Sequence, residues 1–266
     1  SEKEILDGIN EERARINLNH FPILNKMLGL VQGDFLIIGA KTGAGKSSFM
    51  LNLMDDLMTG FQCVYFNMEM SKSTIYKRLV SIKADIQMDD VVNPKTQHQK
   101  EVVEKSLQEL EKANLIIEHK ANNIREIKTI VMKRKDKDRH TILFIDHLGL
   151  TRADDKKTLY EQATEVAKEL RQMCLEYDCT IISASQLNRS AYNSDELSLS
   201  MLKDSGELEN SASKVILLNR TDSKDKSLTV DMDIIIAKNR DGMCGNIAMK
   251  YDKKKQVFKE LTRYDN

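Results

Sequence analysis

The sequence predicts an α/β protein with a mainly parallel, twisted sheet, flanking helices and an antiparallel extension at its C-terminal end. Three patterns lead to this fold class. Short apolar runs alternate with segments of helical periodicity, which is the order of elements that builds parallel sheets. One run enters a glycine-rich turn that is followed at once by a helical pattern. The last two apolar runs alternate with polar residues and have no helix between them, which indicates antiparallel pairing.

The expected elements follow in order along the chain. Apolar runs of strand length predict buried strands at residues 35–38, 63–68, 115–117, 141–146, 180–184 and 214–218. The alternating runs predict two further strands, at residues 228–237 and 246–251. Apolar residues at helical spacing predict helices at 49–54, 71–79, 124–135 and 159–177, with exposed helix and loop over 89–111. Residues 2–16 predict a charged helix whose narrow apolar stripe requires a partner surface.

The composition is that of a soluble globular protein and narrows the classes of function. The 41 Lys and Arg residues equal the 41 Asp and Glu residues, so a nucleic-acid contact requires a local basic patch or an assembly that concentrates such patches. The four cysteines lack metal-ligand spacing, so zinc is not indicated. No apolar run approaches twenty residues and no signal-peptide pattern is visible, which predicts a cytoplasmic protein without a membrane partner.

The most specific motif is the turn after the first strand, Gly39-Ala-Lys-Thr-Gly-Ala-Gly-Lys-Ser-Ser48. Strand, glycine-rich turn and helix form the context of a phosphate-binding P-loop, in which backbone amides cradle a nucleoside triphosphate. Lys46 is expected to reach the β- and γ-phosphates, and the Ser47 hydroxyl to bind Mg²⁺. Ala40 stands where the usual pattern has its first glycine. The predicted nucleotide-binding residues are Thr42, Gly43, Ala44, Gly45, Lys46, Ser47 and Ser48.

Two acidic residues lie at the ends of predicted strands. Asp146 ends the run 141–146 and is expected to bind Mg²⁺ rather than merely to cap the next loop. Glu69 ends the strand after the P-loop, where a carboxylate can orient or deprotonate a water beside the γ-phosphate. A solvated surface charge is the alternative interpretation of Glu69.

Three more polar residues follow predicted strands. Gln186 comes after the strand at 180–184 and either senses the γ-phosphate or simply begins a loop. Lys238 and Arg240 follow the strand at 228–237. They are either exposed charges beside a turn or cationic fingers that reach the γ-phosphate of a neighbouring subunit.

Six motifs in chain order resemble those of the DnaB-type replicative helicases of superfamily 4, which have a RecA-like ATPase core. They are Gly39 to Ser47, Tyr65-Phe-Asn-Met-Glu-Met70, Ile142-Leu-Phe-Ile-Asp-His-Leu148, Ser185-Gln-Leu-Asn-Arg189, Leu202-Lys-Asp-Ser-Gly-Glu207 and Ile236-Ala-Lys-Asn-Arg-Asp-Gly242. The resemblance covers roughly residues 17–260. Alanine at the first P-loop position is common in that family.

The resemblance implies a role for each matching residue. Asp146 is the Walker B acid, Glu69 the catalytic carboxylate and Gln186 the γ-phosphate sensor, with ATP and Mg²⁺ as cofactors. Lys238 and Arg240 act across a subunit interface. The family's central DNA-binding loop matches Lys203, Asp204, Ser205 and Gly206, and Arg189 is a weaker candidate for the same contact.

The resemblance also implies a domain division and partners. Residues 1–18 stand in the place of the family's linker helix, which packs on an adjacent subunit, and residues 19–266 form the motor domain. The family's globular N-terminal domain is not in this sequence, which suits a phage or plasmid helicase or a piece of a longer protein. Expected partners are single-stranded and forked DNA, further copies of the chain in a hexameric ring, primase and a helicase loader.

The function that this resemblance implies is an ATP-driven motor that moves 5′-to-3′ on single-stranded DNA and unwinds duplex DNA as a ring. A RecA-family ATPase that forms filaments is a second hypothesis. A helicase-like regulator that binds nucleotide without unwinding is a third, although intact Glu69, Asp146 and Arg240 argue against a dead ATPase.

Overall fold

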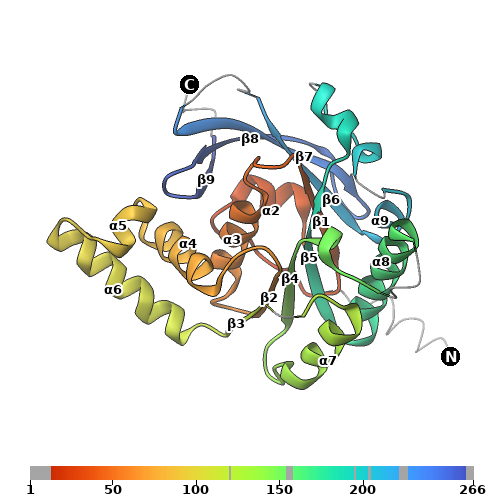
Figure 1. Ribbon diagram of the computed structural model, residues 1–266, viewed down its shortest axis with the longest axis horizontal. Coiled ribbons are helices and arrows are strands. Elements are labelled where there is room, and N and C mark those ends of the chain that lie inside the picture. The colour runs from red at the N-terminus through yellow and green to blue at the C-terminus, as the bar shows by residue number, and fades with distance from the viewer. Residues whose placement is uncertain are drawn as a thin grey trace.

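The computed structural model describes residues 13–119, 121–153, 158–194, 196–202, 205–221 and 227–261. These residues form a nine-stranded sheet in the order β3-β2-β4-β5-β1-β6-β7-β8-β9. Helices cover both faces of its parallel part, and the last strands curve away as an extension (Figure 1). The mixed sheet confirms the predicted fold class.

Six strands form the parallel part of the sheet. They are β1 (Phe35–Ala40), β2 (Gln62–Asn67), β3 (Leu115–Glu118), β4 (Thr141–Asp146), β5 (Cys179–Gln186) and β6 (Lys214–Arg220). β1 lies between β5 and β6, and β4 lies between β2 and β5. Because parallel strands end at the same edge, the residues after β1, β2, β4 and β5 are brought together there.

Three antiparallel strands follow. They are β7 (Thr229–Asn239), β8 (Gly245–Asp252) and β9 (Val257–Glu260). β7 pairs with β6 and β8, and β8 pairs with β9. The sequence did not predict β9, because its four residues carry only two apolar side chains, Val257 and Phe258.

The helices divide between the two faces of the sheet (Figure 1). They are α2 (Pro22–Leu28), α3 (Lys46–Leu57), α4 (Lys72–Ala84), α5 (Met88–Val92), α6 (Gln97–Lys112), α7 (Ile124–Arg134), α8 (Leu159–Glu176) and α9 (Ser205–Ser211), with short 3₁₀ turns η1 (Leu148–Leu150), η2 (Arg189–Asn193) and η3 (Leu199–Met201). None of the helices in the described residues is long and apolar enough to cross a bilayer.

Each face of the sheet has its own apolar cluster. Leu36 and Ile38 of β1 join a cluster with α3, α4 and α6, whereas Phe35 and Ile37 join a second cluster with α7, α8 and α9. This alternation is the two-residue period of a strand that is buried on both faces. β1 is therefore fixed from both sides, and so is the turn that follows it.

The beginning of the described chain differs from the prediction. Residues 13–18 are extended, not helical: Arg15 forms an antiparallel bridge with Val31, and the Ile16 amide donates to the Leu30 carbonyl at 2.8 Å. Ile16 and Leu18 point into this chain's own core, each 1% exposed, and their two-residue spacing is that of a strand. Residues 1–12 of the expected linker helix lie outside the described residues.

Candidate active site

The turn between β1 and α3 has the backbone of an anion cradle. Gly43 and Gly45 have φ angles of 77° and 93°, in the region that glycine adopts at least cost. Gly45 caps α3, so the amides of residues 46–48 in the first helical turn have no carbonyl partners within the helix. A Cβ on Gly45 would lie 3.1 Å from the rings of Tyr251 and Phe258, so β8 and β9 support the turn from behind.

The side chain of Ser48 faces this support instead of the turn. Its hydroxyl donates to Oε1 of Gln256 at 2.5 Å and accepts from the Tyr251 hydroxyl at 3.1 Å. The predicted phosphate contact of Ser48 is therefore left to its backbone amide. The Ser48 hydroxyl instead ties α3 to the β8–β9 hairpin.

Lys46 and Asp146 lie close together at the end of the parallel strands. Lys46 is only 9% exposed; burial lowers its pKa, and the carboxylates of Asp146 and Glu69 oppose this shift. Asp146 is fully buried at the end of β4, as predicted. Its Oδ2 accepts a hydrogen bond from the Tyr65 hydroxyl at 2.8 Å, while its Oδ1 has no hydrogen-bond partner among the described residues.

A buried carboxylate oxygen without a partner fits a hard divalent cation or its bound water. The described residues hold no group of three or more His, Cys, Asp or Glu side chains that could bind a metal by themselves. A cation at Asp146 would therefore take its remaining ligands from the Ser47 hydroxyl and from nucleotide phosphates. These residues fit Mg²⁺ bound together with a nucleotide.

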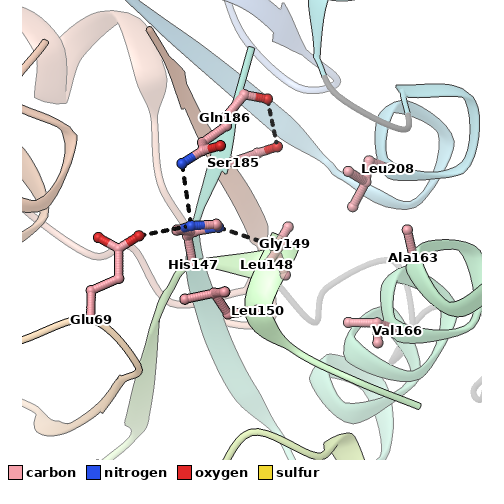
Figure 2. A pocket seen from close by; sticks show the side chains of 10 residues that line it. All are labelled: Glu69, His147, Leu148, Gly149, Leu150, Ala163, Val166, Ser185, Gln186 and Leu208. Carbon is pink, nitrogen blue, oxygen red and sulfur yellow. Dashed lines mark hydrogen bonds and ion pairs between the residues drawn. The ribbon is translucent and has the colours of Figure 1, made fainter. Parts of the chain in front are cut away.

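Glu69, His147 and Gln186 form a hydrogen-bonded row at the same edge (Figure 2). The Glu69 carboxylate lies 2.8 Å from Nε2 of His147, and the Gln186 amide nitrogen lies 3.4 Å from the same Nε2. The sequence predicted that Glu69 ends its strand, but β2 ends at Asn67, so Glu69 lies two residues later, in the loop. The row borders a cavity of about 320 Å³, which Leu208 of α9 lines from the other side.

The segment after β5 lies against the P-loop. The Thr42 amide donates to the Tyr192 hydroxyl at 2.9 Å, and that hydroxyl donates to Oγ1 of Thr42 at 3.0 Å. The Lys41 ammonium donates to the Ser194 carbonyl at 3.3 Å. Tyr192 therefore occupies an amide that the sequence assigns to phosphate binding.

The other end of this segment leads to the predicted DNA-binding loop. Leu187 and Leu202 form an antiparallel bridge, and Arg189 begins the exposed turn η2 between them. Lys203 and Asp204 lie outside the described residues. Ser205 and Gly206 begin α9, and Gly206 is exposed.

Lys238 and Arg240 lie beside the starts of the parallel strands β1 and β6, at the opposite end of these strands from the P-loop. Lys238 is paired with Val215 near the start of β6, and the Arg240 amide donates to the Ser213 carbonyl. The start of β6 lies beside the start of β1, about 13 Å from the end of β1 at roughly 3.3 Å per residue. The side chains donate to carbonyls in the last turn of α9: Lys238 to Glu209, and Arg240 to Asn210 at 2.7 Å.

Comparison with known families decides the assignment. The family described as the DnaB-like helicase C-terminal domain matches residues 18–260. The chain belongs to this family. The match confirms the resemblance inferred from the six motifs, and the RecA-like core that it implies.

Relatives of this DnaB-like domain are replicative helicases. The replicative DNA helicase DnaB of Helicobacter pylori strain J99 is 28% identical, over 99% of this chain and 64% of that protein. The DnaB protein of Geobacillus stearothermophilus is 25% identical, over 91% of this chain and 56% of that protein. The chain thus spans less than two thirds of the length of these curated relatives.

Solved structures of DnaB-like ATPase domains have the same fold. A solved ATPase domain superposes with a TM-score of 0.87 at 25% identity and covers 98% of this chain and 99% of that one. A DnaB-like replicative helicase, solved in a study of its interactions with primase, gives a TM-score of 0.85 at 26% identity. The alignment covers 98% of this chain and 67% of that helicase.

Three residues of this DnaB-like site were missed by the sequence analysis. His147 directly follows Asp146, and a polar residue after a strand-end acid was the available signal. Tyr65 is a buried tyrosine, whose hydroxyl requires a partner. Tyr192 carried no signal, because its contact with Thr42 joins residues that are 150 positions apart.

Proposed function

We propose that the chain is the ATP-hydrolysing motor of a ring-forming replicative DNA helicase, which moves 5′-to-3′ on single-stranded DNA and unwinds duplex DNA. The observation that carries the proposal is the position of Lys238 and Arg240 in a DnaB-like domain. They lie across the sheet from their own P-loop, so any nucleotide that they contact belongs to another copy of the chain. A site shared between subunits couples hydrolysis to assembly.

The cradle of the site is supplied by the subunit that binds the nucleotide. The amides of residues 43 and 45–48 and the Lys46 ammonium hold the ATP phosphates, since the amides of Thr42 and Ala44 already donate to Tyr192 and to the Lys41 carbonyl. Ser47 and Asp146 would hold Mg²⁺. Bound Mg²⁺ neutralises negative charge that develops on the phosphate oxygens. Glu69 orients the attacking water and accepts its proton, and Gln186 contacts the γ-phosphate.

The neighbouring subunit completes this site. Lys238 and Arg240 of one subunit reach the γ-phosphate bound by the next, where cations stabilise the charge of the transition state. Both side chains now hold carbonyls at the end of α9, so their engagement with nucleotide would release this helix. α9 follows directly on the DNA-binding loop, which supports a mechanical link between hydrolysis and DNA.

DNA binding is assigned to the loop 203–206 with help from Arg189. The chain has no net charge at neutral pH, so one loop binds weakly, and a hexameric ring would bring six such loops to one strand. Primase and a helicase loader are further proposed partners, and the cytoplasm is the proposed location. Within this scheme residues 1–18 are the proposed link to a neighbouring subunit, with residues 13–18 anchored on this chain's own core, and residues 19–266 form the motor.

Family membership favours this function over the two alternatives. The curated relatives reported above are replicative DNA helicases. The intact set of Lys46, Glu69 and Asp146 also supports hydrolysis.

Unwinding of a forked duplex tests the proposal directly. We expect the protein to separate a fork with a 5′ single-stranded tail when ATP and Mg²⁺ are present, and to form rings by electron microscopy. Glu69→Gln should bind ATP but lose at least about a hundredfold in hydrolysis and all unwinding, because the water loses its base. Glu111→Gln, an exposed glutamate at the end of α6, is the matched control. Filaments in place of rings, or DNA binding without DNA-stimulated hydrolysis, would reject the proposal.

A further inference from the structure

His147 is held in one tautomer by its neighbours. The Gly149 amide donates to Nδ1 of His147 at 3.1 Å, so Nδ1 carries no proton. An imidazole whose Nδ1 accepts a hydrogen bond and carries no proton is the neutral form of the ring. In a neutral ring the single proton then lies on Nε2, which donates to the Glu69 carboxylate at 2.8 Å.

The hydrogen bond from His147 fixes the carboxylate of Glu69, which β2 does not hold in place by itself. Glu69 lies two residues beyond the end of β2, and its side chain is 40% exposed. An exposed glutamate has several rotatable bonds, so orienting it costs conformational entropy unless a partner holds it. His147 holds Oε1 and leaves Oε2 for a water.

The same imidazole nitrogen faces Gln186. The Gln186 amide lies 3.4 Å from Nε2 of His147, and the hydrogen bonds are consistent when its oxygen, in place of its nitrogen, faces the ring and shares the single Nε2 proton with Glu69. Gln186 ends β5, and the next residue, Leu187, bridges to Leu202 immediately before the predicted DNA-binding loop. The Asn188 amide reinforces this bridge by donating to the Met201 carbonyl at 2.7 Å.

The cavity beside His147 provides room for movement at this point. It is lined by the row of Glu69, His147 and Gln186 on one side and by Leu208 of α9 on the other (Figure 2). α9 begins within the predicted DNA-binding loop. A shift of Leu202 or of α9 can therefore reach Gln186 and the cavity beside it.

We propose that His147 is a positioning residue that orients Glu69 for hydrolysis and links it, through Gln186 and the Leu187–Leu202 bridge, to DNA binding. The inference rests on the proposed helicase function and adds to it a specific link between the sensor and the base. The alternative is a buried histidine that only completes the packing of η1. That alternative predicts lower stability in variants, but an unchanged ratio of DNA-stimulated to basal hydrolysis.

The test compares ATP hydrolysis with and without single-stranded DNA in His147→Phe and His147→Gln. In His147→Phe we expect the DNA-stimulated kcat to fall about 10- to 100-fold and the stimulation ratio to approach one, because Glu69 loses its orientation. The KM for ATP should change less than about twofold, since P-loop contacts remain. His147→Gln should recover much of the stimulation, because its amide can again donate to Glu69.

His140→Phe is the matched control. His140 is a half-buried histidine at the other end of β4, where its Nε2 lies 2.9 Å from the Thr180 hydroxyl. It should keep the stimulation ratio of the wild type. An unchanged ratio in His147→Phe, or a raised basal rate, would overturn the role of His147. Absence of DNA stimulation in the wild type would instead overturn the proposed function.

Discussion

The environment of Asp146 is set by one tyrosine. The Tyr65 hydroxyl occupies Oδ2 of this buried carboxylate and leaves Oδ1 free for a cation or its water. Tyr65 has no other polar group to offer, and its ring packs near Phe144 at 6.4 Å between centroids. It would therefore act on a cation bound there only through the orientation of Asp146. Burial and the nearby Asp146 charge raise the pKa of Tyr65, so it stays a donor at neutral pH.

Tyr65→Phe should weaken Mg²⁺ binding without abolishing nucleotide binding at the P-loop. Loss of the hydroxyl leaves Oδ2 of Asp146 unpaired and the carboxylate free to rotate, and partners of metal ligands are typically worth about 10- to 100-fold in affinity. We expect the Mg²⁺ concentration for half-maximal hydrolysis to rise about tenfold at saturating ATP. Tyr76→Phe, on the exposed side of α4, should have no effect. Equal Mg²⁺ dependence in all three proteins would remove Tyr65 from the metal site.

At the scale of elements, a buried polar network joins the ends of three strands. Lys214, at the start of β6, is fully buried and lies 3.6 Å from Asp34, just before β1. It donates to Oδ1 of Asn239, at the end of β7, at 2.8 Å. The Asn239 amide donates in turn to the carbonyls of Met27 and Leu28. The network fixes the strand end that carries both proposed trans-acting cations.

Asn239→Ala should cost about 1–3 kcal/mol of unfolding free energy, because it leaves buried carbonyls and part of Lys214 without partners. Denaturant unfolding at a fixed protein concentration measures this loss. Asn246→Ala removes an exposed asparagine from β8 and should stay within about 0.5 kcal/mol of the wild type. Similar losses in both variants would mean that the network adds little.

The strands of the parallel sheet could be predicted because each is a continuous apolar run that is buried on both faces. β9 could not, since four residues with two apolar side chains resemble a polar loop. The extended segment 13–18 was also missed. Its two inward residues, Ile16 and Leu18, gain their burial from contacts with distant parts of the chain, which periodicity does not reveal.

At the scale of the whole molecule, the separation of P-loop and cations should appear as complementation. Lys46→Ala and Arg240→Ala should each abolish hydrolysis in a uniform assembly. In an equal mixture, about one interface in four would join an intact P-loop to an intact Arg240, so we expect up to about a quarter of the wild-type rate. The rate of ATP hydrolysis measures this recovery.

The control mixes Lys46→Ala with Asp146→Asn. Both variants damage the nucleotide-binding half of the site, so no interface has an intact P-loop side and the mixture should recover no ATP hydrolysis. No recovery from Lys46→Ala with Arg240→Ala at any mixing ratio would contradict action across the interface. Varying the ratio is essential, because an assembly that requires every site would respond only when few defective subunits are present.

The residues of the site were predictable to the extent that they belong to motifs that are contiguous in sequence. The P-loop and Asp146 follow directly from a strand and its end. The contacts of Tyr65 with Asp146, of His147 with Glu69 and of Thr42 with Tyr192 join distant parts of the chain. They depend on the register of strands and on a long return segment, so the sequence does not contain them locally. Those long-range contacts distinguish a phosphate cradle from a complete hydrolytic site.

The placement of Arg240 opposite the P-loop gives each copy of the chain a front and a back. A two-fold pair, which buries the same surface on both partners, cannot bring one copy's front to the other's back. Copies that meet through these two surfaces must all have the same orientation, in a head-to-tail arrangement. Such an assembly would be polar before it binds any nucleotide, and the shape of a single subunit would then decide in which orientation a DNA strand passes through it.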